Sequence, residues 1–394
     1  MKKLMILGAG VYQVPLIKKA RSMGIETVVA SIDGDYPGFK FADHVYKADT
    51  TDCDQVLAAA IMEDIDGIAT SGTDVAIKTL GYVSEAMKIP GITYKSAQIM
   101  TDKAEMKNAF RGKVATSDYY IISDLDEAFR SAGDLGYPVM VKACDVSGSR
   151  GISKVDSPEN LPDAFNRAKE CSKKDHFIVE KCVEGTEIGV DAVIVHGRPV
   201  LCLPHRKFVK KAGNTTIPGG HAFPIDISDS VRDRILREVS NIAEAAGLGN
   251  CMLNCDMFLC EGGEVSVIEA GARSGATCIP ELIELNTGID YYAQIINCAF
   301  DMEMDLDIKK NAPCMAKLLF CESDGIIESI DQGAVDALRS DRVDIMIDYS
   351  AGDKVRKVRN GTDRIGHVIM KTDDENEIDE VIRKVLDAIR ITEM

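Results

Sequence analysis

The chain has 394 residues, 45% of them hydrophobic and 28% charged, which is the composition of a globular protein with two or three domains. A net charge of −17 argues against a nucleic-acid-binding surface, and no apolar run approaches the roughly 20 residues that span a membrane. The 12 cysteines are scattered without CxxC pairs, which favours free thiols in a reducing compartment, so we expect a cytoplasmic protein.

The first 96 residues predict a small parallel sheet, because strand patterns alternate with helical ones. Strands are expected at 3–7, 27–31, 45–48 and 67–70, and helices at 14–23, 54–63 and 74–87. The start is similar to a dinucleotide-binding fold, but Gln13 stands where the glycine motif has its third glycine. The turns at 8–10 and 71–74 fall at the carboxyl ends of strands, where such sheets bind ligands; helix capping by Thr73 or Asp74 explains the second turn equally well.

Lysines mark the start of the middle region. Asp102 is predicted to cap a helix that begins with Lys103, a cation where the helix dipole disfavours one, which hints at function. Lys142 follows the apolar run 139–141 within the same predicted strand, where burying a lysine is costly unless an anion pairs with it. The loop 145–151 follows, and its small residues suit a polyphosphate cradle; an ordinary hairpin turn with a lysine that reaches solvent is the alternative.

The segment 205–224 is basic and rich in glycine. It is read either as a mobile lid over anionic substrates or as a solvated surface loop. It follows an alternating strand at 187–193 and a further strand at 198–203.

Two acidic residues lie in apolar strands that are predicted to pair. The strands 252–259 and 264–270 are joined by a Gly-Gly turn, and they contain Asp256 and Glu269. Because a buried carboxylate is costly without a partner, these two predict a shared cation, and oxygen ligands favour magnesium over zinc. A helix is expected at 280–300.

The last segment is predicted as a small β-rich lobe capped by a helix at 377–391. Its strands are expected at 315–320, 325–330, 343–347 and 366–370.

The order of these motifs resembles the ATP-grasp superfamily of carboxylate–amine ligases over nearly the whole chain. The resemblance rests on Asp102-Lys103, the strand 136–142, the loop 147–151, the run 180–183, Glu187, Asp256 and the EAGAR sequence at 269–273. That EAGAR sequence and the run Gly366-His367-Val368-Ile369 are similar to the subgroup that includes L-amino-acid ligases. Gly271 departs from the common pattern, in which an asparagine at this position binds metal.

The resemblance implies an α/β fold with three domains. These are an N-terminal Rossmann-like, parallel-sheet domain that precedes the ATP-grasp region (1–96), a two-lobed α+β ATP-grasp domain (97–311) and a C-terminal α+β lobe (312–394). It also implies the following roles. Lys103 and Lys142 contact the phosphates of ATP, and the loop with Ser147, Gly148, Ser149 and Gly151 folds over them. The backbone at Lys181 and Val183 meets adenine, with Glu180 nearby, and Glu187 binds the ribose. Asp256 and Glu269 hold Mg²⁺, and Arg273 acts with Lys142 on the transferred phosphate.

The implied function is an ATP-dependent ligase that activates a small amino-acid-like carboxylate as an acyl phosphate, joins it to an amine and releases ADP and phosphate. Its partners are then small-molecule substrates, with no nucleic acid or membrane. The oligomeric state is left open, with a homodimer as one option because dimers are common in similar proteins. A carboxylase-like or purine-pathway ligase is the alternative within the superfamily. A further alternative is an NAD-dependent oxidoreductase, but that function would leave Lys142 and the two acidic residues unexplained. Because Gly271 departs from the pattern, a non-catalytic nucleotide-binding protein is also an open alternative.

Overall fold

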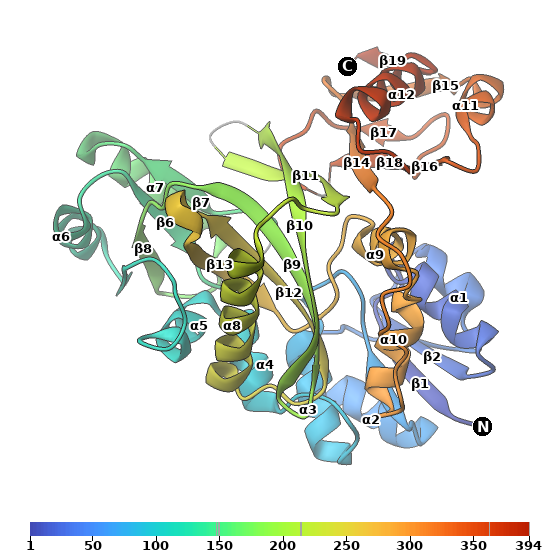
Figure 1. Cartoon of the computed structure of the whole chain (residues 1–394), viewed down its shortest axis with the longest axis horizontal. Coiled ribbons are helices and arrows are strands. Elements are labelled where there is room, and N and C mark those ends of the chain that lie inside the picture. Colours follow the sequence, from blue (N-terminus) through green and yellow to red (C-terminus); the bar gives the residue numbers. More distant parts are fainter. Residues whose placement is uncertain (147, 149, 213–214, 362, 394) are drawn as a thin grey trace.

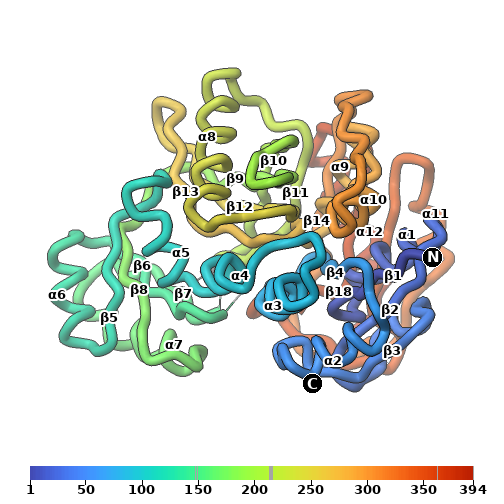
Figure 2. Tube along the Cα trace, turned by 90° about the horizontal axis from the view of Figure 1, so that it is seen from below, coloured from blue at the N-terminus to red at the C-terminus, as the bar shows by residue number. Residues whose placement is uncertain are grey.

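The structure is a computed structural model, and it describes residues 1–146, 148, 150–212, 215–361 and 363–393. Figure 1 shows three parts: a four-stranded lobe and the N-terminal sheet lie on opposite sides of a large central sheet, and Figure 2 gives the same arrangement from below. Within the described residues, no helix is both long and apolar enough to cross a membrane.

The N-terminal part is the parallel sheet expected from the sequence. Its strand order is β3 (His44–Lys47), β2 (Glu26–Ser31), β1 (Lys3–Leu7) and β4 (Gly67–Ala69). The helices are α1 (Val14–Ser22), α2 (Cys53–Glu63) and α3 (Ile77–Met87), with a short 3₁₀ helix at Pro37–Phe41. Four consecutive residues of β1 are buried, as is usual where helices cover both faces of a parallel sheet. The turns at 8–10 and 71–74 both follow the carboxyl ends of strands.

The four-stranded lobe is an antiparallel sheet with two helices. Its order is β5 (Tyr119–Ile122), β8 (Phe177–Lys181), β6 (Val139–Ala143) and β7 (Ile152–Val155). The helices are α6 (Leu125–Leu135) and α7 (Leu161–Cys171), which follows a 3₁₀ turn at Pro158–Asn160. Two further helices, α4 (Tyr94–Thr101) and α5 (Lys103–Phe110), connect the N-terminal part to this lobe.

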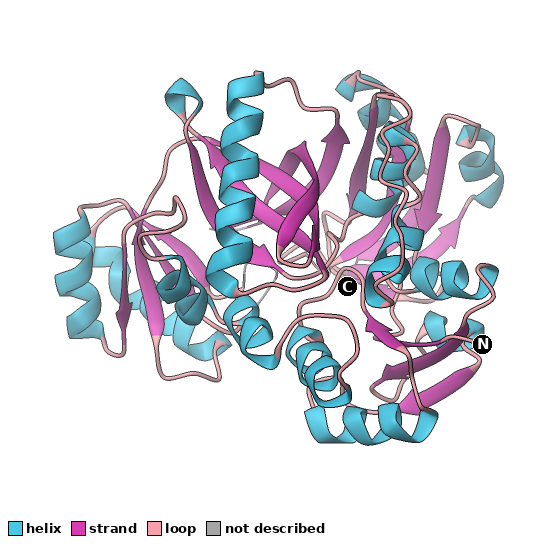
Figure 3. Cartoon of the chain, turned by 60° about the horizontal axis from the view of Figure 1, so that its bottom comes forward, coloured by secondary structure: helices cyan, strands magenta, loops and turns pink. Residues whose placement is uncertain are grey.

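The central sheet has eight strands and is antiparallel throughout. Its order is β13 (Val265–Gly271), β12 (Cys251–Leu259), β9 (Thr186–Val195), β10 (Arg198–Ala212), β11 (Thr215–Phe223), β14 (Cys314–Phe320), β18 (Arg364–Met370) and β16 (Val343–Ile347). The long helix α8 (Asp229–Ala246) crosses in front of these strands in Figure 3 and buries Ile235, Val239 and Ile242 against them. A 3₁₀ turn at Glu261–Gly263 joins β12 to β13.

The C-terminal segment adds a smaller sheet of β17 (Lys354–Val355), β15 (Gly325–Ile330) and β19 (Ile389–Glu393). The helices α11 (Gln332–Leu338) and α12 (Glu375–Asp387) accompany it. The mixed α/β fold, with its β-rich C-terminal lobe, is therefore confirmed.

Several predicted elements are wrong in detail. The segment 205–224 is neither a lid nor a surface loop, because most of it forms the antiparallel pair β10–β11 inside the central sheet. The strand at 187–193 does not alternate, since seven consecutive residues of β9 are buried between its two covered faces. The helix at 280–300 is two helices, α9 (Ile279–Thr287) and α10 (Tyr291–Ala299), because Gly288 ends the first in a left-handed conformation. The last helix ends at Asp387, and Ile391 lies in β19.

Candidate functional site

A cleft of about 1310 Å³ lies where the three parts of the molecule meet. Lys142 and Glu180 reach it from the four-stranded lobe, Asp256 and Glu269 from the central sheet, and Asp74 from the turn that follows β4. Lys142 therefore shares one cleft with the two carboxylates that the sequence analysis placed near it.

The buried end of Lys142 is paired with an anion, as its place in an apolar strand requires. Its ammonium forms an ion pair with Glu180, and Lys107 of α5 binds the other carboxylate oxygen at 2.9 Å. All three side chains are less than 10% exposed. Burial opposes the charged carboxylate, but the two lysines outweigh it and lower the pKa of Glu180 to about 2. The sequence analysis missed Lys107, whose partner lies far away in the chain.

Lys103 lies in the first turn of α5 and is not among the described residues that line the cleft, but it contacts Glu269, which is. Its ammonium lies 3.0 Å from Oε2 of Glu269 and donates to the backbone oxygen of Val146 at 2.9 Å. The charge of Lys103 lowers the pKa of Glu269 to about 2 against the effect of burial, and Lys142 adds to the lowering. Asp102 caps α5 as predicted, because its Oδ1 accepts from the N–H groups of Ala104 and Glu105.

The predicted acidic pair is part of a larger cluster. Asp256 lies directly opposite Glu269 across the β12–β13 pair, and a β-bulge follows it. On the adjoining strand β9, Glu187 shares a cation with Asp256: the ammonium of Lys207 lies 2.5 Å from Glu187 and 2.7 Å from Asp256. Burial and the nearby charges of Glu187 and Glu269 raise the pKa of Asp256, although the ammonium of Lys207 partly offsets this increase. Lys207 comes from the segment misread as a loop, which is why its role was missed.

Arg273 is held by the N-terminal part of the chain. Its Nε and Nη2 donate to the two carboxylate oxygens of Asp74 at 2.8 and 3.1 Å, and its Nη1 donates to Asn254 at 2.8 Å. Burial opposes the charged guanidinium, but the ion pair with Asp74 outweighs it and raises the pKa of Arg273. Asp74 is thus a site residue rather than only a capping candidate.

The same contact explains the glycine in the EAGAR sequence. A Cβ at position 271 would lie 2.9 Å from Oδ1 of Asp74 and 3.4 Å from Cζ of Arg273. Any larger side chain would therefore push the Asp74 carboxylate off Arg273. Gly271 lies directly opposite Asn254 on the paired strand β12, so a side-chain amide is present next to position 271 although residue 271 itself has no side chain.

A buried polar group behind the cleft was not foreseen. Asp191 is fully buried and accepts from Asn254 at 2.9 Å and from the N–H of Gly275 at 2.9 Å, and His205 lies 3.2 Å from it. The ring of His205 packs edge-on against that of His221, which lines the cleft. The signal available in the sequence was an aspartate inside a strand with long apolar runs.

Three further predicted residues line the same opening. Lys181 and Val183 line it after β8, and Gly148 lines it from the loop after β6. Gly151 packs instead toward Ala143 and Cys171 at the base of that loop. Ser147 and Ser149 lie outside the described residues.

Comparison with known proteins identifies two family domains in this chain. Residues 135–281 match the ATP-grasp domain, and residues 317–393 match the L-amino acid ligase C-terminal domain 2. The L-arginine-specific L-amino acid ligase of Bacillus subtilis is 22% identical, over 88% of this chain and 86% of its own length.

Two crystal structures have the same fold over nearly their whole length. Phosphoribosylglycinamide synthetase from Anaerococcus prevotii has a TM-score of 0.80 and 29% identity, and covers all of both chains. L-amino acid ligase from Bacillus licheniformis has a TM-score of 0.85 and 18% identity, and covers 100% of this chain and 99% of its own. The chain thus contains an ATP-grasp domain followed by the C-terminal domain of the L-amino acid ligases, and these relatives indicate an ATP-dependent, ADP-forming ligase.

Proposed function

We propose that this protein is a carboxylate–amine ligase that activates a small amino-acid-like carboxylate as an acyl phosphate. The observation that supports it best is the convergence of Lys142, Arg273 and the Asp256/Glu269 pair on one cleft. Cations that can hold phosphate and carboxylates that can hold a metal thereby face the same space.

ATP is proposed to lie with its phosphates between the four-stranded lobe and the central sheet. Phosphoryl transfer depends mainly on positioning and charge neutralisation, which Lys103 and Lys142 provide. In this proposal Gly148, Gly151, Ser147 and Ser149 fold over the phosphates. Lys181 and Val183 meet adenine, with Glu180 nearby, and Glu187 meets the ribose.

Mg²⁺ is the metal that suits the acidic cluster, because the available donors are carboxylate oxygens. Asp256 and Glu269 would hold it, and bound Mg²⁺ would neutralise charge on the phosphates. Lys207 now neutralises Asp256, so its ammonium would move away from Asp256 when the metal binds there, while its ion pair with Glu187 can remain.

The pair of Asp74 and Arg273 supports an amino acid as substrate. It presents an anion and a cation side by side, which complements the ammonium and the carboxylate of a zwitterion. In the first step a substrate carboxylate oxygen attacks the γ-phosphorus, the bond to the bridging oxygen breaks and ADP leaves. In the second step the amine nitrogen attacks the acyl carbon, phosphate leaves with the electron pair of the C–O bond, and the nitrogen releases a proton.

The test is an ADP-release screen of the full chain with pooled amino acids and small carboxylates, followed by mass spectrometry. The expected product has the mass of two substrates less one water. Lys142→Met should lower the rate about 100-fold or more. Lys107→Met is the matched control, because Lys107 pairs with the same Glu180 but is not among the described residues that line the cleft, and it should lose less than about tenfold. Equal losses in both variants would remove Lys142 from the phosphate site.

A purine-pathway ligase is the second candidate, because the synthetase from Anaerococcus prevotii reaches 29% identity over the whole chain. The same screen separates the two. ADP release that requires a ribonucleotide or bicarbonate favours this second candidate and rejects the first. ATP binding without ADP release in any mixture rejects both and favours a non-catalytic nucleotide-binding protein.

A further inference from the structure

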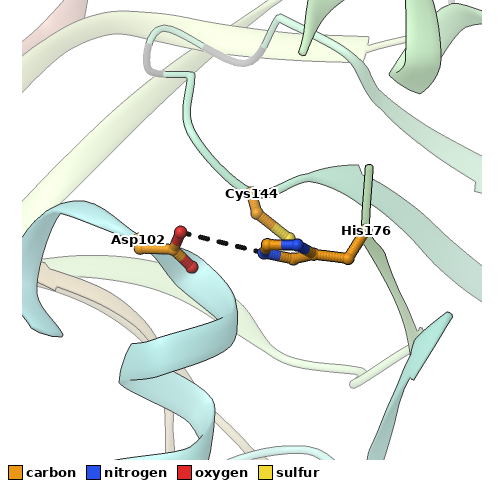
Figure 4. Close-up of side chains that lie close together, drawn as sticks. All are labelled: Asp102, Cys144 and His176. Carbon is orange, nitrogen blue, oxygen red and sulfur yellow. Dashed lines mark ion pairs between the residues drawn. The ribbon is translucent and has the colours of Figure 1, made fainter. Parts of the chain in front are cut away.

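A group of side chains that could hold a metal ion lies outside the acidic cluster. Asp102, Cys144 and His176 each offer one ligand atom, and these atoms all lie within 4.8 Å of one another. Figure 4 shows the three side chains pointing toward a common point from the start of α5, the end of β6 and the start of β8. We propose that this group is a binding site for a thiophilic divalent cation such as Zn²⁺.

The donor set favours this chemistry. A thiolate, an imidazole and a carboxylate are the ligands that zinc takes in proteins, with a water or a further group as the fourth. Mg²⁺ prefers oxygen alone, so the group differs in kind from the cluster of Asp256 and Glu269. Tetrahedral zinc ligands lie about 3.4–3.6 Å from each other at ordinary bond lengths. Nε2 of His176 is 3.8 Å from Oδ2 of Asp102, so these two need only a small closure.

The second polar atoms of Asp102 and His176 have partners of their own, which leaves one ligand atom of each residue facing the group. Oδ1 of Asp102 is used as the cap of α5, which leaves Oδ2 to face His176. Nδ1 of His176 lies 3.2 Å from the carboxylate of Asp175, which leaves Nε2 for the metal. An imidazole held by a carboxylate on its other nitrogen is the usual support for a zinc ligand.

One cation already lies near the group. The ammonium of Lys174 is 3.4 Å from Oδ2 of Asp102, but the Lys174 side chain is 47% exposed. Its long stem lets the ammonium swing into solvent when a metal ion enters. The ammonium of Lys174 would therefore compete with a metal ion for Asp102 but would not block the metal from binding.

The group lies at the base of the proposed phosphate site. The backbone N–H of Lys103 donates to the carbonyl of Cys144 at 2.9 Å, and the loop 145–151 begins directly after Cys144. A metal ion here would join the segments that carry Lys103 and this loop. The proposal itself concerns metal binding and does not depend on the proposed ligase activity.

The test uses the full chain, freed of metal with a chelator and titrated with Co²⁺, whose bond to a thiolate gives an intense charge-transfer absorption. We expect one such Co²⁺ per chain, displaced by Zn²⁺ and unaffected by excess Mg²⁺. Cys144→Ser should abolish the absorption. Cys171→Ser is the matched control, since Cys171 is exposed near the end of α7, and it should keep the absorption. The Asp256→Asn variant of the acidic cluster should keep it as well.

Two further variants guard against a folding defect in Cys144→Ser. Asp102→Asn retains a good helix cap, and His176→Gln retains a polar side chain. Each should weaken binding about tenfold or more, with circular dichroism unchanged. Absence of a thiolate absorption in the unmodified protein, or its survival in Cys144→Ser, would overturn the proposal.

Discussion

At the scale of single residues, Gly271 lies beside Asp74 at a position where this chain departs from the pattern it resembles. The position that commonly holds an asparagine is a glycine here, and the space is taken by a carboxylate from a distant turn. The ion pair of Asp74 with Arg273 is therefore tied to the absence of a side chain at 271. Sequence alone pointed to each of these residues separately but not to their contact, because nothing local relates a turn after β4 to the end of β13.

Substitution at 271 should reproduce the loss of Asp74. In Gly271→Ala the new Cβ displaces the carboxylate, and in Asp74→Ala the carboxylate is gone, so we expect each to lower kcat/KM about tenfold. The double variant should lose little more than either single one. Gly133→Ala is the control, since a Cβ there meets no described atom within 4 Å, and activity should be unchanged. Additive losses would show that the two positions act independently.

At the scale of elements, the sequence predicted correctly those helices and strands whose bounds depend on neighbouring residues in the chain. The strands Gly325–Ile330 and Val343–Ile347 have the predicted bounds, Asp102 caps α5, and the strands with Asp256 and Glu269 pair as expected. The hairpin β10–β11 was missed because its glycines were read as signs of a loop. In fact a Cβ at Gly220 would lie 2.1 Å from the carbonyl oxygen of Ala316 on β14, so this glycine permits close approach of a neighbouring strand. Such pairing is non-local and leaves no local signal.

The hairpin matters for function because it carries Lys207 to Glu187 and Asp256. In Lys207→Met these two carboxylates lose their cation, so we expect a loss of about 3–5 kcal/mol in unfolding free energy when a chelator is present. Mg²⁺ should restore stability more in this variant than in the unmodified protein, and at lower concentration, because the lysine no longer competes. The measurement is denaturant unfolding with and without Mg²⁺.

Lys210→Met is the matched control on the same strand. Lys210 pairs with Glu322, whose side chain is 75% exposed, so its loss should change stability by less than about 1 kcal/mol and leave the Mg²⁺ response unchanged. A Lys207→Met variant that responds to Mg²⁺ like the unmodified protein would contradict a metal role for Asp256.

At the scale of the whole molecule, the segment 312–394 contributes three strands to the central sheet. Its strand β14 pairs with β11 from Gly220 opposite Lys317 to Phe223 opposite Cys314, and β18 and β16 extend the sheet further. The four-stranded lobe has a core of its own, formed by residues between 122 and 179 together with partly buried neighbours in the same range. The folding of the central sheet should therefore depend on the C-terminal segment more than the folding of the four-stranded lobe does.

Deletion of residues 312–394 should act on the cleft through the hairpin. Without β14, the strand β11 becomes an unpaired edge, and Ala222 loses the apolar cluster that it shares with Met315 and Leu319. We expect the amides of 215–223 to lose most of their protection from hydrogen exchange, with loss of ATP binding because Lys207 is no longer held at the acidic cluster. Hydrogen-exchange mass spectrometry supplies its own control, since the strands β6 and β8 should keep their protection. Full protection of 215–223 in the shortened chain would mean that the hairpin is stable without its neighbour and that the two regions fold independently.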